Sequence, residues 1–245
     1  MLSIVILTHN SEDTIADCLE SLKPMDGELI VVDSKSEDRT GEIAERMGAK
    51  VYSRSFVNFS DQRNFAMQKT HADWVLYIDS DEITTDKFCK EVLMVIKNYD
   101  SSSGVGGYFI SRKTFFLKKD WGFADRVQRL INKDKFITWE GILHETPKIK
   151  GVFGSIENPI LHFTHQNLSS MVEKTNEWSE YEAKLRLESH HPKMSSWRFF
   201  RVMLSAFLKS YIQEKVYKNG TTGVIESIFQ AFSMFITYAK LWEMQ

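Results

Sequence analysis

WVLYIDSDE, residues 74–82, is the stretch that decides the fold of this chain. Its first five residues form an unbroken apolar run, which is typical of a strand buried on both faces inside a parallel sheet. The run ends in an acidic cluster that contains Asp79, Asp81 and Glu82. Ligands of open parallel sheets bind beyond the carboxyl ends of the strands, so this stretch predicts both a sheet interior and a site at its edge.

Strands and helices are expected to alternate on both sides of this stretch. Short apolar and β-branched runs predict strands at 3–8, 28–32, 50–53, 106–111, 127–131, 148–151 and 159–161. Apolar residues at three- and four-residue spacing predict a helix between a cap at Ser11 and Pro24, and helices over 40–47, 61–69 and 87–98. Residues 118–125 are expected to form a loop. The alternation predicts an α/β fold with a mostly parallel, Rossmann-like sheet flanked by helices.

The composition is that of an ordinary globular protein. The 245 residues are 42% hydrophobic and 26% charged, which excludes wholesale disorder, collagen and a polytopic membrane protein. A formal net charge of −2 argues against non-specific binding of nucleic acid. Cys18 and Cys89 lack metal-binding spacing, and the first residues carry no secretory signal pattern, so we expect a cytoplasmic protein.

Polar clusters follow three of the expected strands. Thr8, His9 and Asn10 follow the first, Asp33 and Ser34 follow the second, and residues 79–82 follow the fourth. Each cluster alone has a structural explanation, because Asp, Ser and Asn are frequent turn and cap residues. Three clusters at one edge of one sheet are harder to explain in that way. Their convergence favours a binding site.

The Asp79-Ser80-Asp81 triplet predicts a metal site. If the chain stays extended there, both carboxylates project to the same side and repel each other unless a cation lies between them. Oxygen ligands without clustered His or Cys favour Mg²⁺ or Mn²⁺ over zinc. After a buried strand, the triplet is moderate evidence for a metal-bound diphosphate.

Several longer stretches carry a family resemblance. They are SIVILTHNSEDTI (3–15), VVDSKSEDRT (31–40), SDQRNFAM (60–67) before WVLYIDSDE, and VQRLINKDKFITWEGILHE (127–145). Residues 3 to about 165 resemble a family 2 glycosyltransferase with the GT-A fold. The last stretch, with Leu161 and His162 downstream, is similar to the subgroup that contains lipopolysaccharide inner-core glucosyltransferases. The implied organisation is a nucleotide-sugar-binding catalytic domain at 1–165 and a helical region at 166–245.

The resemblance implies a role for individual residues of the donor site. Thr8, Asn10 and Glu12 fall where the family lines the nucleotide pocket, Asp33 matches the acid that hydrogen-bonds the uracil ring, and Asp38 is a contact to the base or ribose. Arg63 and Asn64 match the pair before the metal strand, where an Arg approaches the diphosphate or holds the aspartates. Asp79 and Asp81 match the DxD motif, with Asp81 the better direct ligand. A surface helix cation is the alternative for Arg63.

The general base of an inverting transfer is harder to assign. Such a reaction needs one carboxylate or imidazole that takes the proton of the acceptor hydroxyl. Many relatives have an acidic pair where this chain has His144 and Glu145. We favour Glu145 as the base, with His144 orienting it or contacting phosphate, and Glu140 remains a third alternative.

Four more residues complete the candidate site. His162 follows apolar residues and would ordinarily be a buried hydrogen-bonding group, but the resemblance implies a late histidine that binds the metal or diphosphate. His165 is an alternative for that histidine. Asp125 and Gln128 lie in the segment that would face the acceptor.

The tail differs from the rest of the chain. Residues 166–245 hold ten Lys and Arg against eight Asp and Glu, which leaves 21 against 25 for residues 1–165. From residue 195 onward, aromatic and aliphatic residues recur at helical spacing beside a polar strip of Arg198, Arg201, Ser205 and Lys209. The tail is either a helix pair that packs on the catalytic domain or a second subunit, or one that lies in the headgroup region of an anionic membrane.

Together these features predict a metal-dependent inverting transferase. It would move a sugar, with glucose expected, from a UDP-sugar to a saccharide or lipid-linked saccharide at the cytoplasmic membrane face, and its oligomeric state is left open. A nucleotidyltransferase is one alternative, although the first strand lacks the Gly-rich loop that such enzymes usually show. A non-catalytic membrane-associated binding module is the other.

Overall fold

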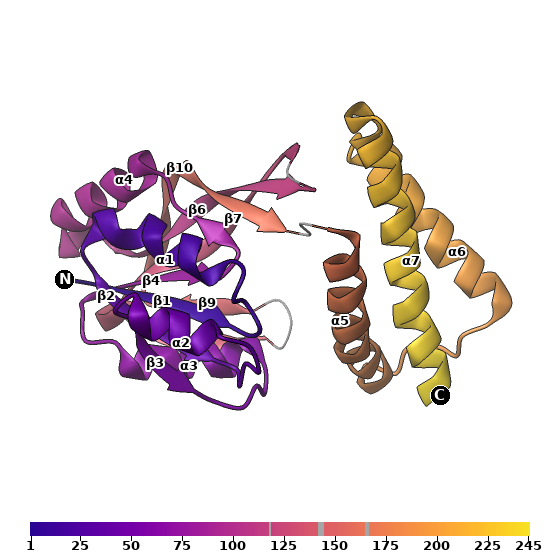
Figure 1. Ribbon diagram of the computed structural model, residues 1–245, viewed down its shortest axis with the longest axis horizontal. Helices are drawn as coiled ribbons and strands as arrows, with labels where there is room; N and C mark the ends of the chain where they lie inside the picture. Colours follow the sequence, from indigo (N-terminus) through magenta and orange to yellow (C-terminus); the bar gives the residue numbers. More distant parts are fainter. Residues whose placement is uncertain (118, 142–144, 165–166) are drawn as a thin grey trace. The chain divides into compact units, whose positions relative to one another are not determined.

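The computed structural model describes residues 1–117, 119–141, 145–164 and 167–245, without the side chains of 121–123 (Figure 1). The chain forms two compact units, Met1–Thr164 and His165–Gln245. Each unit is described by itself.

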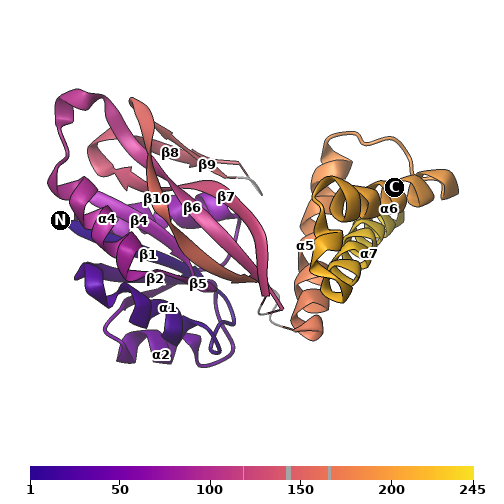
Figure 2. The ribbon, with the colours of Figure 1, turned by 90° about the horizontal axis from the view of Figure 1, so that it is seen from above.

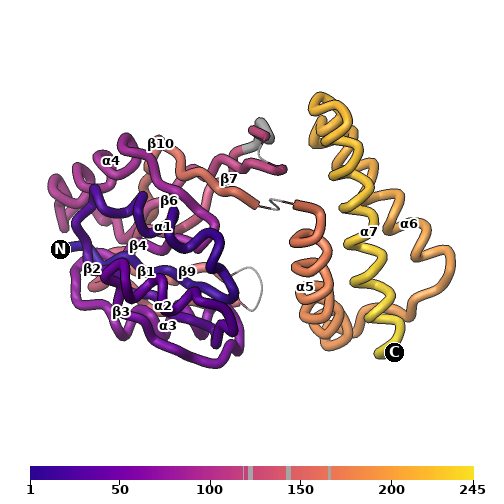
Figure 3. Tube along the Cα trace, viewed as in Figure 1, coloured from indigo at the N-terminus to yellow at the C-terminus, as the bar shows by residue number. Residues whose placement is uncertain are grey.

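An eight-stranded sheet forms the centre of the first unit. Its strand order is β3-β2-β1-β4-β7-β6-β10-β5, so β1 lies between β2 and β4 (Figure 3). The strands are β1 Leu2–Thr8, β2 Glu28–Asp33, β3 Lys50–Ser53, β4 Trp74–Asp79, β5 Glu82–Ile83, β6 Val105–Phe116, β7 Lys119–Asn132 and β10 Val152–Thr164. The four neighbouring strands β3, β2, β1 and β4 run parallel to one another, and β6 runs parallel to β10. Strands β7 and β5 run antiparallel to their neighbours. The predicted mostly parallel sheet is confirmed.

Helices and a small hairpin cover the two faces of this sheet. The helices are α1 Ile15–Leu22, α2 Thr40–Arg46, α3 Phe59–Lys69 and α4 Asp86–Lys97, and the hairpin pairs β8 Phe136–Glu140 with β9 Thr146–Ile149. Residues of α1, α2 and α4 pack with one set of alternating strand side chains, such as Ile4 and Leu76. Residues of α3 and β8 pack with the other set, such as Val5 and Tyr77. Figure 2 accordingly shows β8 and β9 on the side of the sheet away from α1 and α2.

Two local predictions were wrong. The first helix begins at Ile15 after Thr14, and Ser11 supports it through its main-chain carbonyl, which accepts from the amides of both residues, and not as a side-chain cap. The loop expected at 118–125 is instead strand from residue 119, because β6 and β7 extend into a long antiparallel pair. Lys119, Asp120, Ala124 and Arg126 of β7 are exposed, so much of this part of the strand has a polar sequence like that of a loop. Position 118 lies outside the described residues.

The second unit is helical. It contains α5 Leu168–Glu188, α6 Ser196–Leu208 and α7 Thr221–Met244, with a π-helical turn Lys209–Gln213 and a 3₁₀ turn Val216–Asn219 between α6 and α7. α7 packs against both α5 and α6. The small core is formed by Ala183, Met194, Val202, Tyr238 and Leu241. Among the residues described, none of the helices is long and apolar enough to cross a membrane.

Candidate active site

The carboxyl ends of three neighbouring strands meet at one edge of the sheet. Thr8 of β1 pairs with Asp33 of β2, and Leu7 pairs with Asp79 of β4. The structure thus brings together the three clusters that follow these strands in the sequence. This placement is a direct result of the parallel register, since parallel neighbours end on the same side.

Hydrogen bonds join the loops that follow β1 and β2. Asp38 accepts from the amide of Glu12 at 3.0 Å and from the amide and hydroxyl of Thr40. Burial opposes the charged form of Asp38, but these hydrogen bonds outweigh it and lower its pKa. Asn10 Oδ1 accepts from the amide of Glu37 at 2.9 Å, and Glu12 Oε2 accepts from the amide of Arg39 at 3.1 Å. Asn10, Glu12 and Asp38 therefore shape the loop pair, whatever else they contact.

Thr8 and Asp33 lie beneath these loops. The Asp33 carboxylate accepts from the amide of Ser36 at 3.0 Å and from its hydroxyl. The hydroxyl of Thr8 is buried and has no hydrogen-bond partner among the described residues. An unpartnered buried hydroxyl is costly, and a polar ligand at this edge could satisfy it.

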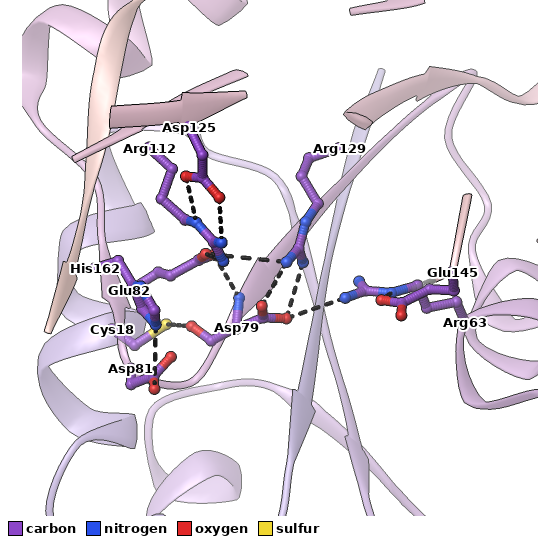
Figure 4. A network of polar contacts seen from close by, with 10 residues as sticks. All are labelled: Cys18, Arg63, Asp79, Asp81, Glu82, Arg112, Asp125, Arg129, Glu145 and His162. Atoms are coloured by element: carbon purple, nitrogen blue, oxygen red, sulfur yellow. Dashed lines mark hydrogen bonds and ion pairs between the residues drawn. The ribbon is translucent and has the colours of Figure 1, made fainter. Parts of the chain in front are cut away.

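Asp79 is held by two arginines (Figure 4). Arg129 of β7 donates to both carboxylate oxygens, at 2.8 and 2.5 Å, and Arg63 of α3 donates to Oδ1 at 3.2 Å. Burial would raise the pKa of Asp79, but the two guanidinium groups hold it well below its usual range. Since both oxygens accept from arginine, this arrangement disfavours Asp79 as a direct metal ligand and makes it an anchor.

Arg63 connects that anchor to the candidate base. Its Nε donates to Glu145 Oε1 at 2.9 Å, while its Nη2 contacts Asp79. The guanidinium lies 5.3 Å from the Tyr77 ring centroid and 5.1 Å from that of Trp139, and the side chain is only 2% exposed. A surface helix cation is thereby ruled out for Arg63. The contact fixes Glu145 relative to the end of β4.

Asn64, the next residue of α3, supports the same arrangement through Trp139. Its amide nitrogen donates to the carbonyl of Trp139 at 3.0 Å, and its oxygen accepts from the amide of Trp139 at 2.9 Å. The side chain therefore fastens β8 to α3 through both atoms of its amide. It positions the ring that covers Arg63.

A second group of charges lies next to Asp79. Glu82 is fully buried, accepts from the amide of Asp79 at 2.8 Å and lies 3.5 Å from Arg112. Burial, followed by the negative charge of Asp79, raises the pKa of Glu82. Arg112 binds Asp125 through two hydrogen bonds, at 3.0 and 2.5 Å, so Asp125 belongs to an internal ion pair. Gln128 lies opposite Phe109 in the β6–β7 pair and is partly exposed.

Asp81 faces a different partner. Its Oδ2 lies 3.5 Å from His162 Nε2, and its carbonyl accepts from the amide of Phe163 at 3.0 Å where β5 pairs with β10. Nδ1 of His162 is buried without a hydrogen-bond partner in the described part of the chain. No cluster of three or more metal-ligating side chains occurs among those residues. Asp81 and His162 are thus a two-residue site that oxygens of a ligand or water could complete.

Comparison with known proteins identifies the family. The sequence model described as glycosyl transferase family 2 matches residues 3–153. The chain belongs to this family. A glycosyltransferase of Rickettsia typhi is 29% identical to it, with 99% of this chain and 87% of the relative aligned. The lipopolysaccharide core biosynthesis glycosyltransferase LpsC of Rhizobium meliloti is 25% identical, with 99% of this chain and 92% of LpsC aligned.

A solved structure shares the fold of this glycosyltransferase. S. aureus TarS 1–349, solved in complex with UDP-GlcNAc, has a TM-score of 0.50 and 13% sequence identity, with 99% of this chain and 90% of TarS covered. The predicted enzyme class is confirmed by the family assignment and the relatives, which also removes the nucleotidyltransferase alternative. His144 and His165 lie outside the described residues.

Two arginines of this site were missed by sequence reasoning. Arg112 and Arg129 lie in β6 and β7, and their partners Asp125, Asp79 and Glu82 are 13 to 50 positions away. The only signal was the presence of basic residues in otherwise apolar stretches such as VQRLI. Such a residue is costly to bury without an acidic partner, so it indicates an ion pair without identifying the partner.

Proposed function

We propose that this glycosyltransferase transfers a sugar, with glucose expected, from a UDP-sugar to a saccharide or lipid-linked saccharide such as a lipopolysaccharide inner core, with inversion at the anomeric carbon. The observation that carries the proposal is the arrangement at the end of β4. Asp81 with His162 lies on one side of it, and Glu145 is held through Arg63 on the other. Such a transfer needs a cation site for the diphosphate and a base for the acceptor hydroxyl, and residues around the end of β4 would supply both.

The donor would bind at the carboxyl ends of β1 and β2. Thr8 contributes an unpartnered buried hydroxyl there, and Asp33 lies beside it on the next strand. Asp33 would hydrogen-bond the uracil ring, as the family resemblance implies. Asn10, Glu12 and Asp38 would act by holding the two loops in the shape that receives the nucleotide.

Asp81 and His162 are the residues that would hold Mg²⁺ or Mn²⁺. One carboxylate and one imidazole are a suitable set for a cation that keeps most of its coordination for phosphate oxygens and water. When bound, such a cation neutralises charge that develops on the leaving diphosphate. Asp79 would keep Arg63 and Arg129 in place next to it.

Glu145 would take the proton from the acceptor hydroxyl as that oxygen attacks the anomeric carbon. Arg63 donates to one carboxylate oxygen of Glu145 and so fixes its orientation. His144 remains the alternative base. A single base is sufficient because the leaving diphosphate needs no protonated acid once its charge is neutralised.

The acceptor proposal depends on sequence similarity. LpsC is named for lipopolysaccharide core biosynthesis and aligns with 99% of this chain. We accordingly place the reaction at the cytoplasmic face of the membrane, where a lipid-linked acceptor would present its saccharide, with peripheral attachment through the C-terminal helices. At 13% identity TarS shares only the fold, so the donor is proposed from the pocket residues and not from its ligand.

A donor panel tests this proposal. UDP release is measured with each UDP-sugar, with and without Mn²⁺, in the presence of a lipopolysaccharide core acceptor, and calorimetry measures UDP binding. We expect Mn²⁺-dependent UDP binding that Asp81→Asn abolishes and Asp79→Asn weakens less. The pair is matched, because both changes remove one charge two residues apart. UDP binding that ignores Mn²⁺, or an absence of turnover with every UDP-sugar, would contradict the proposal.

A further inference from the structure

The second unit exposes large apolar side chains in regular rows. On α6 and the π-helical turn, Trp197, Phe200, Leu204, Leu208 and Ile212 recur at intervals of three or four and are all exposed, Trp197 at 67% and Phe200 at 58%. At 100° per residue, the α6 members of this row lie on the side of the helix opposite the buried Val202. The outward face of α6 is therefore apolar, whereas a water-facing helix face is usually polar.

Helix α7 carries a second row of exposed apolar side chains. Val224, Ile228, Phe232, Phe235 and Trp242 are exposed and share one side of the helix. Phe235 lies 5.9 Å, ring centroid to centroid, from Phe199 of α6, so the α7 row borders α6. Exposed apolar rows on two neighbouring helices exceed the scattered single residues that need no explanation.

Positive charge accompanies these rows. Residues 193–218 carry six cations, Lys193, Arg198, Arg201, Lys209, Lys215 and Lys218, against Glu214 alone. On α6, Arg201 and Arg198 flank the apolar row on one side, as the helical spacing requires. The preceding residues 167–192, which include α5, carry five acidic side chains against three basic ones. The charge is thus concentrated on the part of the unit that exposes Trp197 and Phe200.

The geometry points to an anionic lipid surface as the partner of this face. We propose that α6, the turns after it and the exposed row of α7 lie in the headgroup region of a membrane that contains acidic phospholipid. Apolar side chains would enter the acyl boundary, and the flanking cations would meet lipid phosphates. The inference deepens the proposed function, because it rests on an acceptor at the membrane and names the surface that reaches it.

Charge decides between this partner and a second copy of the chain. Two copies that met through residues 193–245, which include α6, the turns after it and α7, would bring seven cations against seven, with three acids on each side to offset them. An anionic bilayer attracts the same cations. Trp197 and Trp242 also suit a membrane interface, because an indole ring is apolar with one polar N–H.

Flotation with lipid vesicles tests the proposal on the full chain. Vesicles of phosphatidylcholine alone are compared with equal mixtures of phosphatidylcholine and phosphatidylglycerol, at low and high salt. We expect flotation with the mixed vesicles that salt weakens. The double variant Trp197→Ser/Phe200→Ser should lose tenfold or more in vesicle affinity. Neutralising Arg201, Lys215 and Lys218 to Gln should lower it about fivefold per charge.

A matched variant controls for lost apolar surface as such. Val57→Ser/Met94→Ser removes two apolar side chains of the first unit that are 62% and 61% exposed, and it should float like the unchanged chain. Three outcomes would overturn the proposal. The first is equal flotation of all variants. The second is that the Trp197/Phe200 variant changes its mass in light scattering but not its flotation. The third is that the same variant unfolds at a lower temperature but floats unchanged.

The two proposals fail separately. Calorimetric UDP binding with Mn²⁺ uses no membrane and should be unchanged in the Trp197→Ser/Phe200→Ser variant. If the chain floats with anionic vesicles but binds no UDP, only the proposed function is wrong. If it binds UDP but ignores vesicles, only the membrane surface is wrong.

Discussion

The first unit of this glycosyltransferase buries charged side chains, whereas the helical unit exposes large apolar ones. The buried side chains of the first unit include Arg63, Arg129 and Glu82. Both arginines contact the carboxylate of Asp79, and Arg129 also lies 4.0 Å from Glu82. Trp197 in the second unit is mostly exposed. Each arrangement is unfavourable in water on its own, because buried charge loses hydration and exposed apolar surface orders water.

The comparison teaches where to look for function in each unit. The buried charges of the first unit compensate one another and hold Glu145 and Asp79 in fixed positions, so their cost is offset inside the unit. The exposed apolar rows of the second unit have no such compensation among the described residues of that unit, so we infer that it comes from outside the unit. Variants of one unit should therefore leave the other unit unaffected.

The largest expected effect concerns the base of the first unit. Glu145→Gln keeps an oxygen that can accept from Arg63 but loses the basic carboxylate, so turnover should fall by about 10² to 10⁴ while UDP binding stays nearly intact. Steady-state UDP release and calorimetry measure the two quantities. His144→Ala is the companion variant. Unchanged turnover in Glu145→Gln together with a loss in His144→Ala would transfer the role to His144.

The next effect tests whether Asp79 is an anchor. Arg129→Met leaves the Asp79 carboxylate, which is 31% exposed, with one of its two arginines, so the cost should lie at the low end for a buried ion pair, about 3 kcal/mol of folding free energy. Hydrogen exchange should show the loss in β4 and β7 but not in α7. Arg126→Met is the control, because Arg126 is an exposed arginine of the same strand. Equal destabilisation by both variants would remove the special role of Arg129.

The core of the second unit allows the reciprocal experiment. Leu241 is fully buried in α7, and Leu241→Ala should cost about 2–5 kcal/mol through lost contacts and a cavity. Faster hydrogen exchange should appear in α5, α6 and α7, with UDP binding unchanged. Leu187→Ala, at a more exposed position of α5, should have little effect. Faster exchange in β1 would show that the two units are energetically coupled, which would break the comparison.

Local sequence patterns predicted the positions of the strands and helices well in the first half of the chain. Strands such as 74–78 are buried on both faces, and their apolar runs are visible without knowledge of their neighbours. The long β6–β7 pair was recognised only in part, since charged residues such as Arg112 and Lys113, which point to opposite faces of β6, interrupt its apolar pattern. The hydrophobic pattern of a partly exposed strand depends on which of its faces meets water, and the tertiary structure is needed to know that face.

The candidate site was predicted by position more reliably than by role. The three strand ends converge, as parallel geometry requires. The pairing of Arg129 with Asp79 and of Arg112 with Asp125 depends on the register between strands far apart in sequence, so the sequence could not show these two contacts. Asn64 was expected at the cofactor site from the family resemblance, and its hydrogen bonds to Trp139, 75 positions away, could not be predicted from the sequence.

The smallest effect lies at the opposite edge of the same sheet. Glu28 begins β2 and accepts hydrogen bonds from Lys50 at 2.9 Å and from Ser3 at 2.7 Å, with His71 also in contact. Burial would raise the pKa of Glu28, but these partners lower it to about 2. A carboxylate with a lowered pKa stabilises the fold above its unfolded value, and the contribution is lost as the pH falls from about 4.5 towards 2.

Because Lys50 and His71 are solvent-exposed, water screens these contacts and the contribution should be about 1 kcal/mol. Urea unfolding of Glu28→Gln should therefore show a loss of about that size at pH 7 and a shallower decline of stability in acid. Glu20→Gln, in an exposed ion pair with Lys23, should leave the acid dependence unchanged. An acid profile of Glu28→Gln identical to that of the unchanged chain would mean that Glu28 makes no contribution to the acid sensitivity of the fold.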